Sequence, residues 1–581
     1  MSSFPVEKTW WKEAVVYQIY PASYLDSNGD GLGDIPGIIS KVPYIKSLGV
    51  DAIWLSPIFA SPQKDMGYDV ADYRSIHAPY GTINEVQTLI EKLHANNIRI
   101  LMDLVVNHTS DQHAWFKESR SSKSSAKRQW YIWRDAKYDE MGNRKEPNNW
   151  KSIFGGSAWV FDEGSDQYYL ALFLPSQPDL NWENADMRKA THDDMRFWLD
   201  RGVDGFRIDS MNLMSKHPDL PDGKIVNPDE PYQSGAEFFA SGPKMHDYIR
   251  EIRTEVLDHY DVMTVGELGF TKDEKSVRQY VAKDRHELNM LFTGDIVDMD
   301  FGANAKYERD DFHPRKIRHI TNMWQKAMPK FNGWNTIYLD NHDSGRSLSR
   351  YASDAPQHRS NAAKMMATYM TTLSGTPFML AGQEIGMANL GKDYGAESYI
   401  DVEGKNYYNE VLKNRGGNVE KMNDVLREMQ LKSRDHGRLP MQWDNSPHAG
   451  FTVESAQPWM TVNKDFTEWN VASQLDDPNS IMAYWKQILA LRKAYKDLLV
   501  YGSYTALDES ETGEMVLGYE RESSETGQKA VVLLNFSNQS QQVTVQRYEG
   551  FKVLISNQSG DGIVKEEVEL QSYGAVVLLS A

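Results

Sequence analysis

A pair of opposite charges ends an apolar segment at residues 205–210, whose sequence is GFRIDS. Arg207 and Asp209 are two positions apart, and side chains two apart on a strand point to the same face. Phe206 and Ile208 alternate with them, as in a short buried strand. Burying charges costs free energy unless they are paired or used. We interpret Asp209 as a catalytic nucleophile that Arg207 holds ionised, although a purely structural ion pair explains these six residues equally well.

Other apolar segments also end in residues that can transfer protons or bind sugar hydroxyls. If these ends meet at one place, Asp209, Glu267 and Asp343 form a cluster of three carboxylates. Such a cluster of like charge is costly as structure alone, whereas glycoside hydrolysis needs a pair of carboxyl groups beside the scissile bond. The residues that end the other segments are Asp103, Asn107 and His108; Glu267; and Asp340, Asn341, His342 and Asp343.

The segments that carry these residues alternate with helical patterns, which is typical of a parallel sheet with crossover helices. A count of about eight units predicts an α/β fold, the (β/α)8 TIM barrel, whose active site lies on the loops after the strands. Helical spacing covers residues 35–48, 84–96 and 187–200. The expected strands are at 15–20, 52–58, 99–106, 205–210, 262–267, 289–293, 336–340 and 377–381.

The chain has 581 residues, too many for one compact core, so we expect several domains. The barrel is predicted at 1–110 and 179–503, interrupted at 111–178 by a small inserted domain that is polar and rich in Trp, Ser and Lys. A second excursion covers about 386–461. Beyond 504 the pattern is alternating and β-branched, which predicts a C-terminal antiparallel β-sandwich domain.

The composition is that of a soluble globular protein, with 40% hydrophobic and 25% charged residues. A net charge of −19 argues against nucleic acid or an anionic membrane as partner. The sequence contains no cysteine, which fits a reducing compartment. The N-terminus shows no apolar signal region, and no apolar run is long enough to span a bilayer. We therefore expect a cytoplasmic protein. We also predict a monomer or a weak dimer.

Oxygen-bearing side chains alternate through the glycine-rich loop at residues 26–34. This arrangement suits a hard cation such as calcium and resembles the start of an EF-hand loop, but the bidentate Glu is missing. The alternative is a turn of Asx and Gly residues that binds nothing. We expect a structural rather than a catalytic ion, with ligands from Asp26, Asn28, Asp30, the Leu32 carbonyl and Asp34.

Taken together, these motifs resemble glycoside hydrolase family 13, the α-amylase clan, and within it the α-glucosidase and oligo-1,6-glucosidase group. The matching segments occur in the family's order across nearly the whole chain. They are residues 66–69, 103–108, 177–181, 205–209, Glu267, 341–343 and 438–443.

The resemblance implies a retaining mechanism, in which Asp209 attacks the anomeric carbon and Glu267 acts as general acid and then base. Retention requires these carboxyl groups about 5–5.5 Å apart. Asp343 would stabilise the oxocarbenium-like transition state, and His108 and His342 would donate hydrogen bonds to the same sugar. We expect neighbouring negative charge to raise the Glu267 pKa, and Arg207 to lower that of Asp209.

The resemblance also implies a pocket closed at one end, and therefore release of single glucose units. Asp69 and Arg438 would grip the non-reducing end as a bidentate pair, and Tyr68 and Gln177 would line the same subsite. The loop at 26–34 matches the group's calcium or magnesium site.

Linkage specificity in this group depends on the residue after the nucleophile. Val there goes with isomaltose-type activity, and Thr or Ala with maltose-type. Ser210 is small and hydroxylated, so we predict hydrolysis of maltose, malto-oligosaccharides and sucrose. One alternative is an isomaltase or oligo-1,6-glucosidase. The other is an inactive homologue serving as a binding subunit, which the presence of all three carboxylates disfavours.

Overall fold

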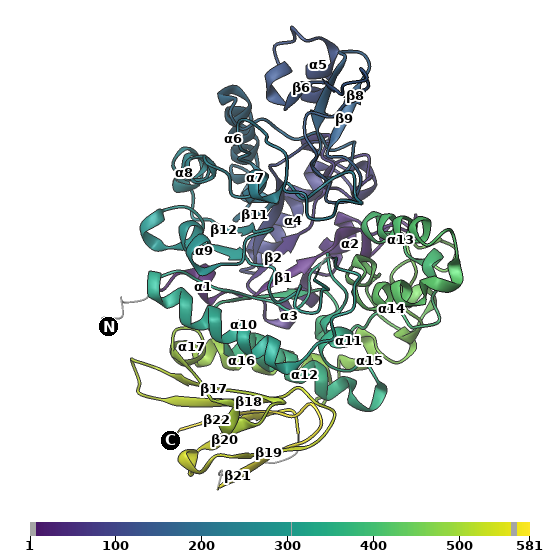
Figure 1. The fold of residues 1–581 in the computed structure, drawn as a ribbon. Coiled ribbons are helices and arrows are strands. Elements are labelled where there is room, and N and C mark those ends of the chain that lie inside the picture. The colour runs from purple at the N-terminus through teal and green to yellow at the C-terminus, as the bar shows by residue number, and fades with distance from the viewer. Residues whose placement is uncertain (1–6, 304, 559–565, 581) are drawn as a thin grey trace.

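The computed structural model describes residues 7–303, 305–558 and 566–580, and its centre is a parallel eight-stranded sheet (Figure 1). The strand order is β13-β12-β11-β5-β2-β1-β15-β14. At the seam between the end strands β13 and β14, the Thr336 hydroxyl donates to the Leu291 carbonyl at 2.7 Å. The barrel is thus nearly closed, which confirms the predicted fold class. The strands are β1 (Val16–Ile19), β2 (Ala52–Leu55), β5 (Arg99–Val105), β11 (Gly205–Asp209), β12 (Met263–Glu267), β13 (Met290–Phe292), β14 (Thr336–Ile337) and β15 (Thr376–Leu380).

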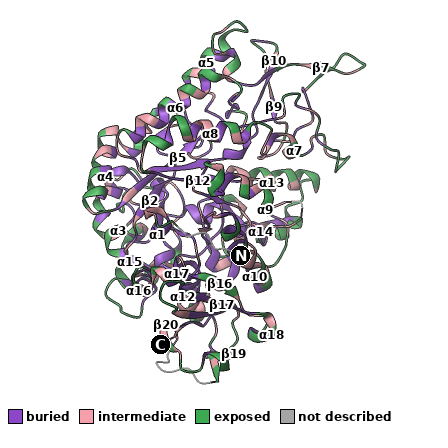
Figure 2. Ribbon diagram, turned by 90° about the vertical axis from the view of Figure 1, so that its left-hand side faces the viewer, coloured by how far each residue is buried: buried purple, intermediate pink, exposed green. Residues whose placement is uncertain are grey.

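Helices surround the sheet, and most of them bury one face against it and expose the other, as Figure 2 shows. The helix at residues 356–372 differs, because its residues 365–372 are all buried. In α4, a capping box between Thr82 and Glu85 starts the helix, and the apolar residues follow at helical spacing. The main helices of this layer are α4 (Ile83–Ala95), α6 (Ala185–Leu199), α8 (Met245–Glu255), α9 (Glu274–Val281), α10 (Pro314–Ala327), α12 (Pro356–Thr372) and α16 (Ile481–Ala494).

The single helix predicted over 35–48 is wrong in one respect, because the chain breaks there into α2 (Ile35–Ser40) and α3 (Val42–Leu48). Lys41 between them leaves helical geometry, with φ −98° and ψ 5°. Pro43 explains the break: it has no N–H to donate, and its ring would clash with the carbonyl four residues earlier.

The strand that carries Asp209 begins at a position that only glycine can occupy. Gly205 has φ +146°, and a Cβ added there would lie 1.9 Å from the carbonyl oxygen of Met263. Any side chain would therefore push β11 away from β12. This close approach places Asp209 and Glu267, at the ends of the two strands, beside each other.

The insertion after β5 forms a three-stranded antiparallel sheet in the order β6-β10-β9, at the top of Figure 1. The strands are β6 (Trp133–Asp135), β9 (Trp159–Asp162) and β10 (Gln167–Leu170). Residues 128–130 form a 3-10 turn shortly before β6. Trp150 is fully buried and donates its indole N–H to the Pro221 carbonyl at 2.8 Å. The insertion thus shares its apolar core with the long loop after β11.

The second excursion carries α13 (Val402–Asn414) and α14 (Asn423–Lys432), which lie beside the barrel mouth in Figure 1. Met422, Val425 and Met429 pack there against Tyr307 and Tyr399. This small apolar cluster joins the excursion to the loop after β13. It holds α13 beside the carboxyl ends of the strands.

The C-terminal region is an antiparallel sheet of five strands with a two-stranded sheet against it. Along β18, Ala530, Val532 and Leu534 pack with the barrel core, while Val531 and Leu533 pack with the two-stranded sheet. This is the period of two expected for a strand buried on both faces. The strands are β16 (Ser503–Ala506), β17 (Val516–Glu522), β18 (Lys529–Asn535), β20 (Lys552–Ser556) and β22 (Ala575–Leu579), with β19 (Gln541–Thr544) pairing with β21 (Glu567–Leu570).

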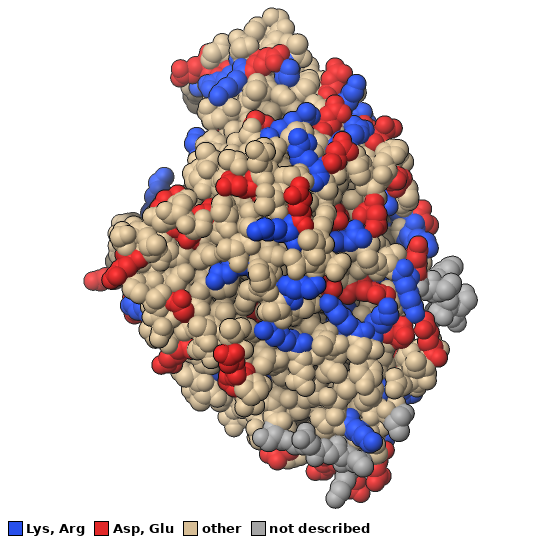
Figure 3. All heavy atoms as spheres, turned by 180° about the vertical axis from the view of Figure 1, so that it is seen from behind, with Lys and Arg blue, Asp and Glu red and all other residues tan. Residues whose placement is uncertain are grey.

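The surface carries both signs of charge, intermixed on the face shown in Figure 3. Among the helices that the structure describes, none has the combination of length and apolar character that crossing a membrane requires.

Candidate active site

A cavity of about 170 Å³ opens at the carboxyl ends of the barrel strands. A cavity of about 150 Å³ holds a benzene-sized ring, so this one has the scale of a single sugar ring. Ten of its thirteen lining residues are polar or charged. Its lining residues are Asp65, Tyr68, His108, Ile153, Phe154, Phe173, Asp209, Ser210, Glu267, Lys306, Asp343, Glu403 and Arg434.

Arg207, on β11, connects three carboxylates beneath this cavity. Its Nη1 lies 2.7 Å from Asp209 and 2.9 Å from Asp103, and its Nη2 lies 3.0 Å from Glu267. The guanidinium is buried, as are Asp103 and Asp209. The guanidinium of Arg207 thus holds carboxylates from three adjacent strands at fixed positions. Asp209 and Glu267 lie close together, as predicted.

Glu267 ends β12 with about a third of its side chain open, and it lines the cavity. The backbone N–H of Ser210 donates to its Oε2 at 3.0 Å. Ser210 adopts φ +44°, a left-handed conformation that is strained for a residue other than glycine. Desolvation in the cavity raises the Glu267 pKa to about 7, against the effect of Arg207 and with help from Asp209 and Asp343. The direction is as expected, but burial is the main cause.

Asp209 behaves differently from the prediction. Burial raises its pKa to about 6 even though Arg207 lowers it, because Asp103 and Asp343 add negative charge nearby. Arg207 acts in the expected direction, but a guanidinium shared among three acids cannot fully offset the desolvation of each one.

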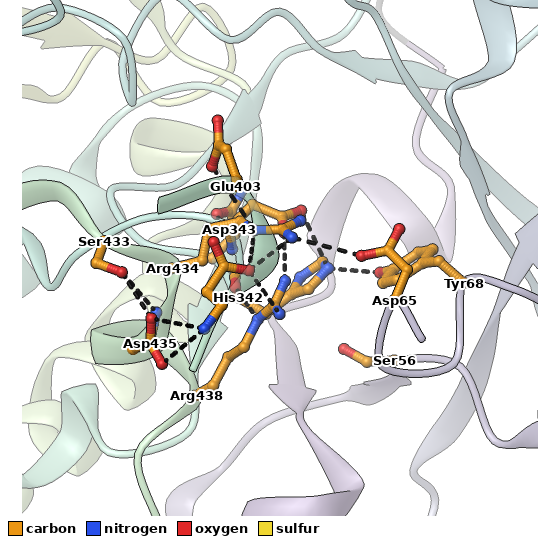
Figure 4. A network of polar contacts seen from close by, with 12 residues as sticks. Ser56, Asp65, Tyr68, His342, Asp343, Glu403, Ser433, Arg434, Asp435 and Arg438 are labelled. Carbon is orange, nitrogen blue, oxygen red and sulfur yellow. Dashed lines mark hydrogen bonds and ion pairs between the residues drawn. The ribbon is translucent and has the colours of Figure 1, made fainter. Parts of the chain in front are cut away.

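Asp343 follows β14 and is held by two arginines and a histidine, as Figure 4 shows. Arg438 lies 2.8 Å from its Oδ1 and Arg434 lies 3.2 Å from the same atom, while His342 Nε2 lies 3.1 Å from Oδ2. Burial alone would raise the Asp343 pKa, but His342 and the two guanidinium groups lower it well below its usual range. Asp343 therefore stays ionised at the pH values at which Asp209 and Glu267 change their protonation state.

Both predicted histidines are buried beside the cavity. His342 lies 2.5 Å from the Tyr68 hydroxyl, and Gln18 donates to its Nδ1 at 2.8 Å. With Nδ1 accepting, Nε2 carries the proton and faces Asp343 and Tyr68. Burial lowers the pKa of His342, and likewise that of His108, to about 3. Each is thus a neutral imidazole that can donate one hydrogen bond.

The predicted pair of Asp69 and Arg438 is wrong. Asp69 is fully buried and accepts hydrogen bonds from the Ser61 hydroxyl at 2.8 Å and from the backbone N–H groups of residues 64 and 65. It does not reach the cavity. Asp65, four residues earlier, lies there instead, 3.4 Å from Arg434 Nη2.

Gln177 lies behind the cavity wall and donates from Nε2 to Asp65 at 3.0 Å. It thus positions Asp65 from behind. No pattern in the sequence distinguishes Asp65 from Asp69, since both belong to the same loop.

The sequence motifs do not identify Arg434 as a site residue, although it begins η11 (Arg434–Arg438), one turn before Arg438. Its guanidinium contacts Asp401 at 2.6 Å as well as Asp65 and Asp343. Because Asp401 caps α13, this contact ties α13 to a residue of the cavity wall. No spacing in the sequence predicts that contact.

The loop at 26–34 carries the expected oxygens, but protein donors already engage two of its carboxylates. Asp26 accepts the N–H groups of Gly29 and Gly31, each at 2.7 Å, and Asp34 accepts that of Gly37 at 2.6 Å. Over the described ranges, no three carboxylate or imidazole side chains are grouped to hold a metal. The donor chemistry fits a hard cation, whose binding would have to displace some of these bonds.

The chain was compared with protein families and with known proteins. The family described as alpha amylase, catalytic domain, matches residues 18–502. An α-glucosidase of Schizosaccharomyces pombe is 43% identical over 585 residues, with 100% of each chain covered. An oligo-1,6-glucosidase of Parageobacillus thermoglucosidasius is 43% identical over 577 residues, covering 98% of this chain and 99% of the relative.

Two solved structures are similar over the whole fold. A trehalose-6-phosphate hydrolase of Bacillus licheniformis has a TM-score of 0.90 at 38% identity, covering 99% of this chain and 100% of that one. An isomaltulose synthase of Erwinia rhapontici has a TM-score of 0.92 at 38% identity, with the same coverage.

Asp65 reaches the cavity and Asp69 does not, so substitutions at the two positions should have different effects. Asp65→Asn removes a charged acceptor from the cavity, so kcat/KM on a chromogenic α-glucoside should fall by about ten- to a hundredfold. Asp69→Asn removes an acceptor that holds a buried loop, so it should mainly lower the unfolding temperature in calorimetry. An Asp65→Asn protein of undiminished activity would contradict this placement.

Proposed function

The chain belongs to the α-amylase family, glycoside hydrolase family 13, and to its α-glucosidase and oligo-1,6-glucosidase group, and from this premise we propose a retaining, exo-acting α-glucosidase. It would release glucose from the non-reducing end of short α-1,4-linked oligosaccharides such as maltose, and from sucrose. The observation that carries the proposal is a cavity on the scale of one ring with Asp209, Glu267 and Asp343 in its wall.

In the proposed mechanism, Asp209 attacks the anomeric carbon while Glu267 protonates the leaving oxygen. Water then enters, Glu267 removes its proton, and glucose leaves with its anomeric configuration retained. Both carboxylates bind one guanidinium, Asp209 at Nη1 and Glu267 at Nη2. A fork of that size suits the separation of about 5–5.5 Å that a retaining pair needs.

Asp343 and the groups around it supply the remaining requirements. Its permanently ionised carboxylate faces a ring that gains positive charge in the transition state, where fixed charge is most effective. Asp65, held by Arg434 and Gln177, offers an acceptor to hydroxyls of the same sugar. The ion pairs of Arg434 with Asp65 and Asp343 bound one side of the cavity, which supports cleavage of terminal glucose.

The maltose-type linkage preference rests on Ser210, which lines the cavity next to Asp209. The two relatives described above, one named α-glucosidase and one named oligo-1,6-glucosidase, are equally similar to this chain at 43% identity. The isomaltase reading is therefore the alternative to exclude by experiment.

Hydrolysis of maltose, isomaltose, sucrose and maltotriose, followed side by side with the product anomer recorded by NMR, tests the proposal. We expect maltose and sucrose to be preferred and α-glucose to appear first, and Ser210→Val to shift the preference toward isomaltose. Asp209→Ala should lose at least about 10⁴-fold in kcat. Faster turnover of isomaltose than maltose by the wild type would overturn the linkage, and β-glucose appearing first would overturn retention.

The two raised pKa values predict a narrow pH optimum. Asp209 must be ionised to attack, so kcat/KM should fall as the pH drops through about 6. Glu267 must be protonated to donate, so it should fall again as the pH rises through about 7. Because Asp209 and Glu267 share Arg207, the two limbs of the pH profile report the titration of the coupled pair and not of either residue alone. Glu267→Gln, assayed on a glucoside with a good leaving group, should lose the alkaline limb; a retained limb would contradict the assignment.

We also propose that the loop at 26–34 takes a calcium or magnesium ion in a structural role. The oxygens of Asp26, Asn28, Asp30, Asp34 and the Leu32 carbonyl support it. After chelation, millimolar calcium should raise the unfolding temperature of the wild type but not of Asp30→Ala. An equal response of both proteins would count against the site. Cytoplasmic location and a monomer or weak dimer remain predictions.

A further inference from the structure

A second, larger cavity of about 500 Å³ continues outward from the catalytic one. The two cavities share Ile153, Phe154, Lys306 and Glu403 in their walls. If glucose fills the inner cavity, as the proposed function requires, the group that leaves with the scissile oxygen must lie in the outer one. The chemistry of this outer cavity therefore decides which leaving groups are accepted.

The outer cavity is enclosed by segments from five parts of the chain. The insertion contributes residues 151–155, the loop after β11 contributes Glu230 and Phe239, the loop after β12 contributes Phe270, and residues 305–308 face α13. Phe270 is 56% exposed and meets Phe239 edge to face. These rings give an apolar patch against which a sugar can pack, while the remaining wall is charged.

The charged part of this wall is predominantly acidic. Its described lining residues include four Glu and two Lys, and no Arg, for a formal charge of −2. Both lysines are engaged by acids of the same wall. Lys151 lies 2.8 Å from Glu230 and 3.6 Å from Glu410. Lys306 lies 2.8 Å from Glu403 and donates to the Asp343 carbonyl at 3.0 Å.

The acids are held in place by contacts between the walls. The Lys151 N–H donates to the Gln233 carbonyl at 2.8 Å, which joins the insertion to the loop after β11. Asn406, on α13, donates from Nδ2 to the Phe154 carbonyl at 3.0 Å. Glu230 and Glu410 therefore approach Lys151 from two different walls that are both fixed to the insertion, and they present a stable negative surface.

We infer that this outer cavity selects the leaving group by charge, accepting neutral or cationic sugars and rejecting anionic ones such as sugar phosphates, with Glu230 and Glu410 as the specificity-determining residues. A phosphate would bring like charge into a wall whose cations already have partners. This distinguishes the chain from the structurally similar hydrolase whose name specifies trehalose 6-phosphate. The inference rests on the proposed function and adds a substrate class to it.

The test uses α-glucosyl disaccharides of the linkage that the wild type cleaves best, with only the reducing-end sugar varied. That sugar is glucose, glucosamine or glucose 6-phosphate, assayed near pH 6 so that the amine is charged. At distances of several ångströms in a partly hydrated cavity, each like-charge pair costs a few-fold in affinity. We expect kcat/KM for the phosphate compound to be lower than for the neutral one by on the order of tenfold or more, and the difference to shrink in high salt.

The double variant Glu230→Gln, Glu410→Gln leaves Lys151 without these acids. The ratio of the neutral to the phosphorylated rate should then fall at least about threefold, because each change removes one like charge and Lys151 becomes available to the phosphate. Glu420→Gln is the matched control: this exposed residue of η10 (Val419–Met422) lies on the same excursion but not in the cavity wall. Its ratio should equal that of the wild type.

Equal rates on the neutral and phosphorylated disaccharides, or a ratio that the double variant leaves unchanged, would overturn the inference. A protein that hydrolyses none of the disaccharides would instead overturn the proposed function. The two failures are therefore distinguishable in one set of assays, provided that calorimetry shows each variant to be folded.

Discussion

The active site depends on one buried guanidinium shared by acids from three neighbouring strands. Arg207 pairs in register with Asp103 across β11 and β5, and with Val265 across β11 and β12. The parallel register therefore places Asp103, Asp209 and Glu267 around it. Without this cation, two buried carboxylates and the partly open Glu267 would repel one another at a high cost in free energy. The barrel brings these side chains together, and their ion pairs with Arg207 offset the free energy of placing like charges side by side.

The distribution of cations then separates the three carboxylates of the cavity by their pKa. Asp209 and Glu267 share Arg207, so desolvation prevails and both pKa values rise. Asp343 has Arg434, Arg438 and His342 beside it, and its pKa falls. Three chemically similar side chains thus obtain different protonation behaviour from their neighbours alone. The unequal sharing of arginine is what makes a division of labour among them physically possible.

Much of this could be predicted from the sequence, for reasons that also explain the errors. Strand ends are readable because apolar runs stop there, and a parallel barrel gathers these ends, so Asp209, Glu267 and Asp343 could be placed together. Asp65 and Asp69 lie in a loop, where no period fixes side-chain direction. Met66 and Gly67 between them both adopt positive φ, which turns Asp65 into the cavity and Asp69 away from it. Likewise, the pKa of Asp209 depends mainly on its burial, which sequence motifs do not reveal.

The insertion is not an independent module. Trp150 rests on Gly235, where an added Cβ would lie 2.5 Å from its ring, and it bonds to Pro221. Its core is completed by Leu213, Leu220 and Phe239 from the loop that follows Asp209. A chimera built by transplanting residues 111–178 alone would therefore lose part of this core and disturb the loop next to the nucleophile. The insertion and the loop after β11 must therefore be exchanged together. A substitution at a core position of one segment changes the packing of the other.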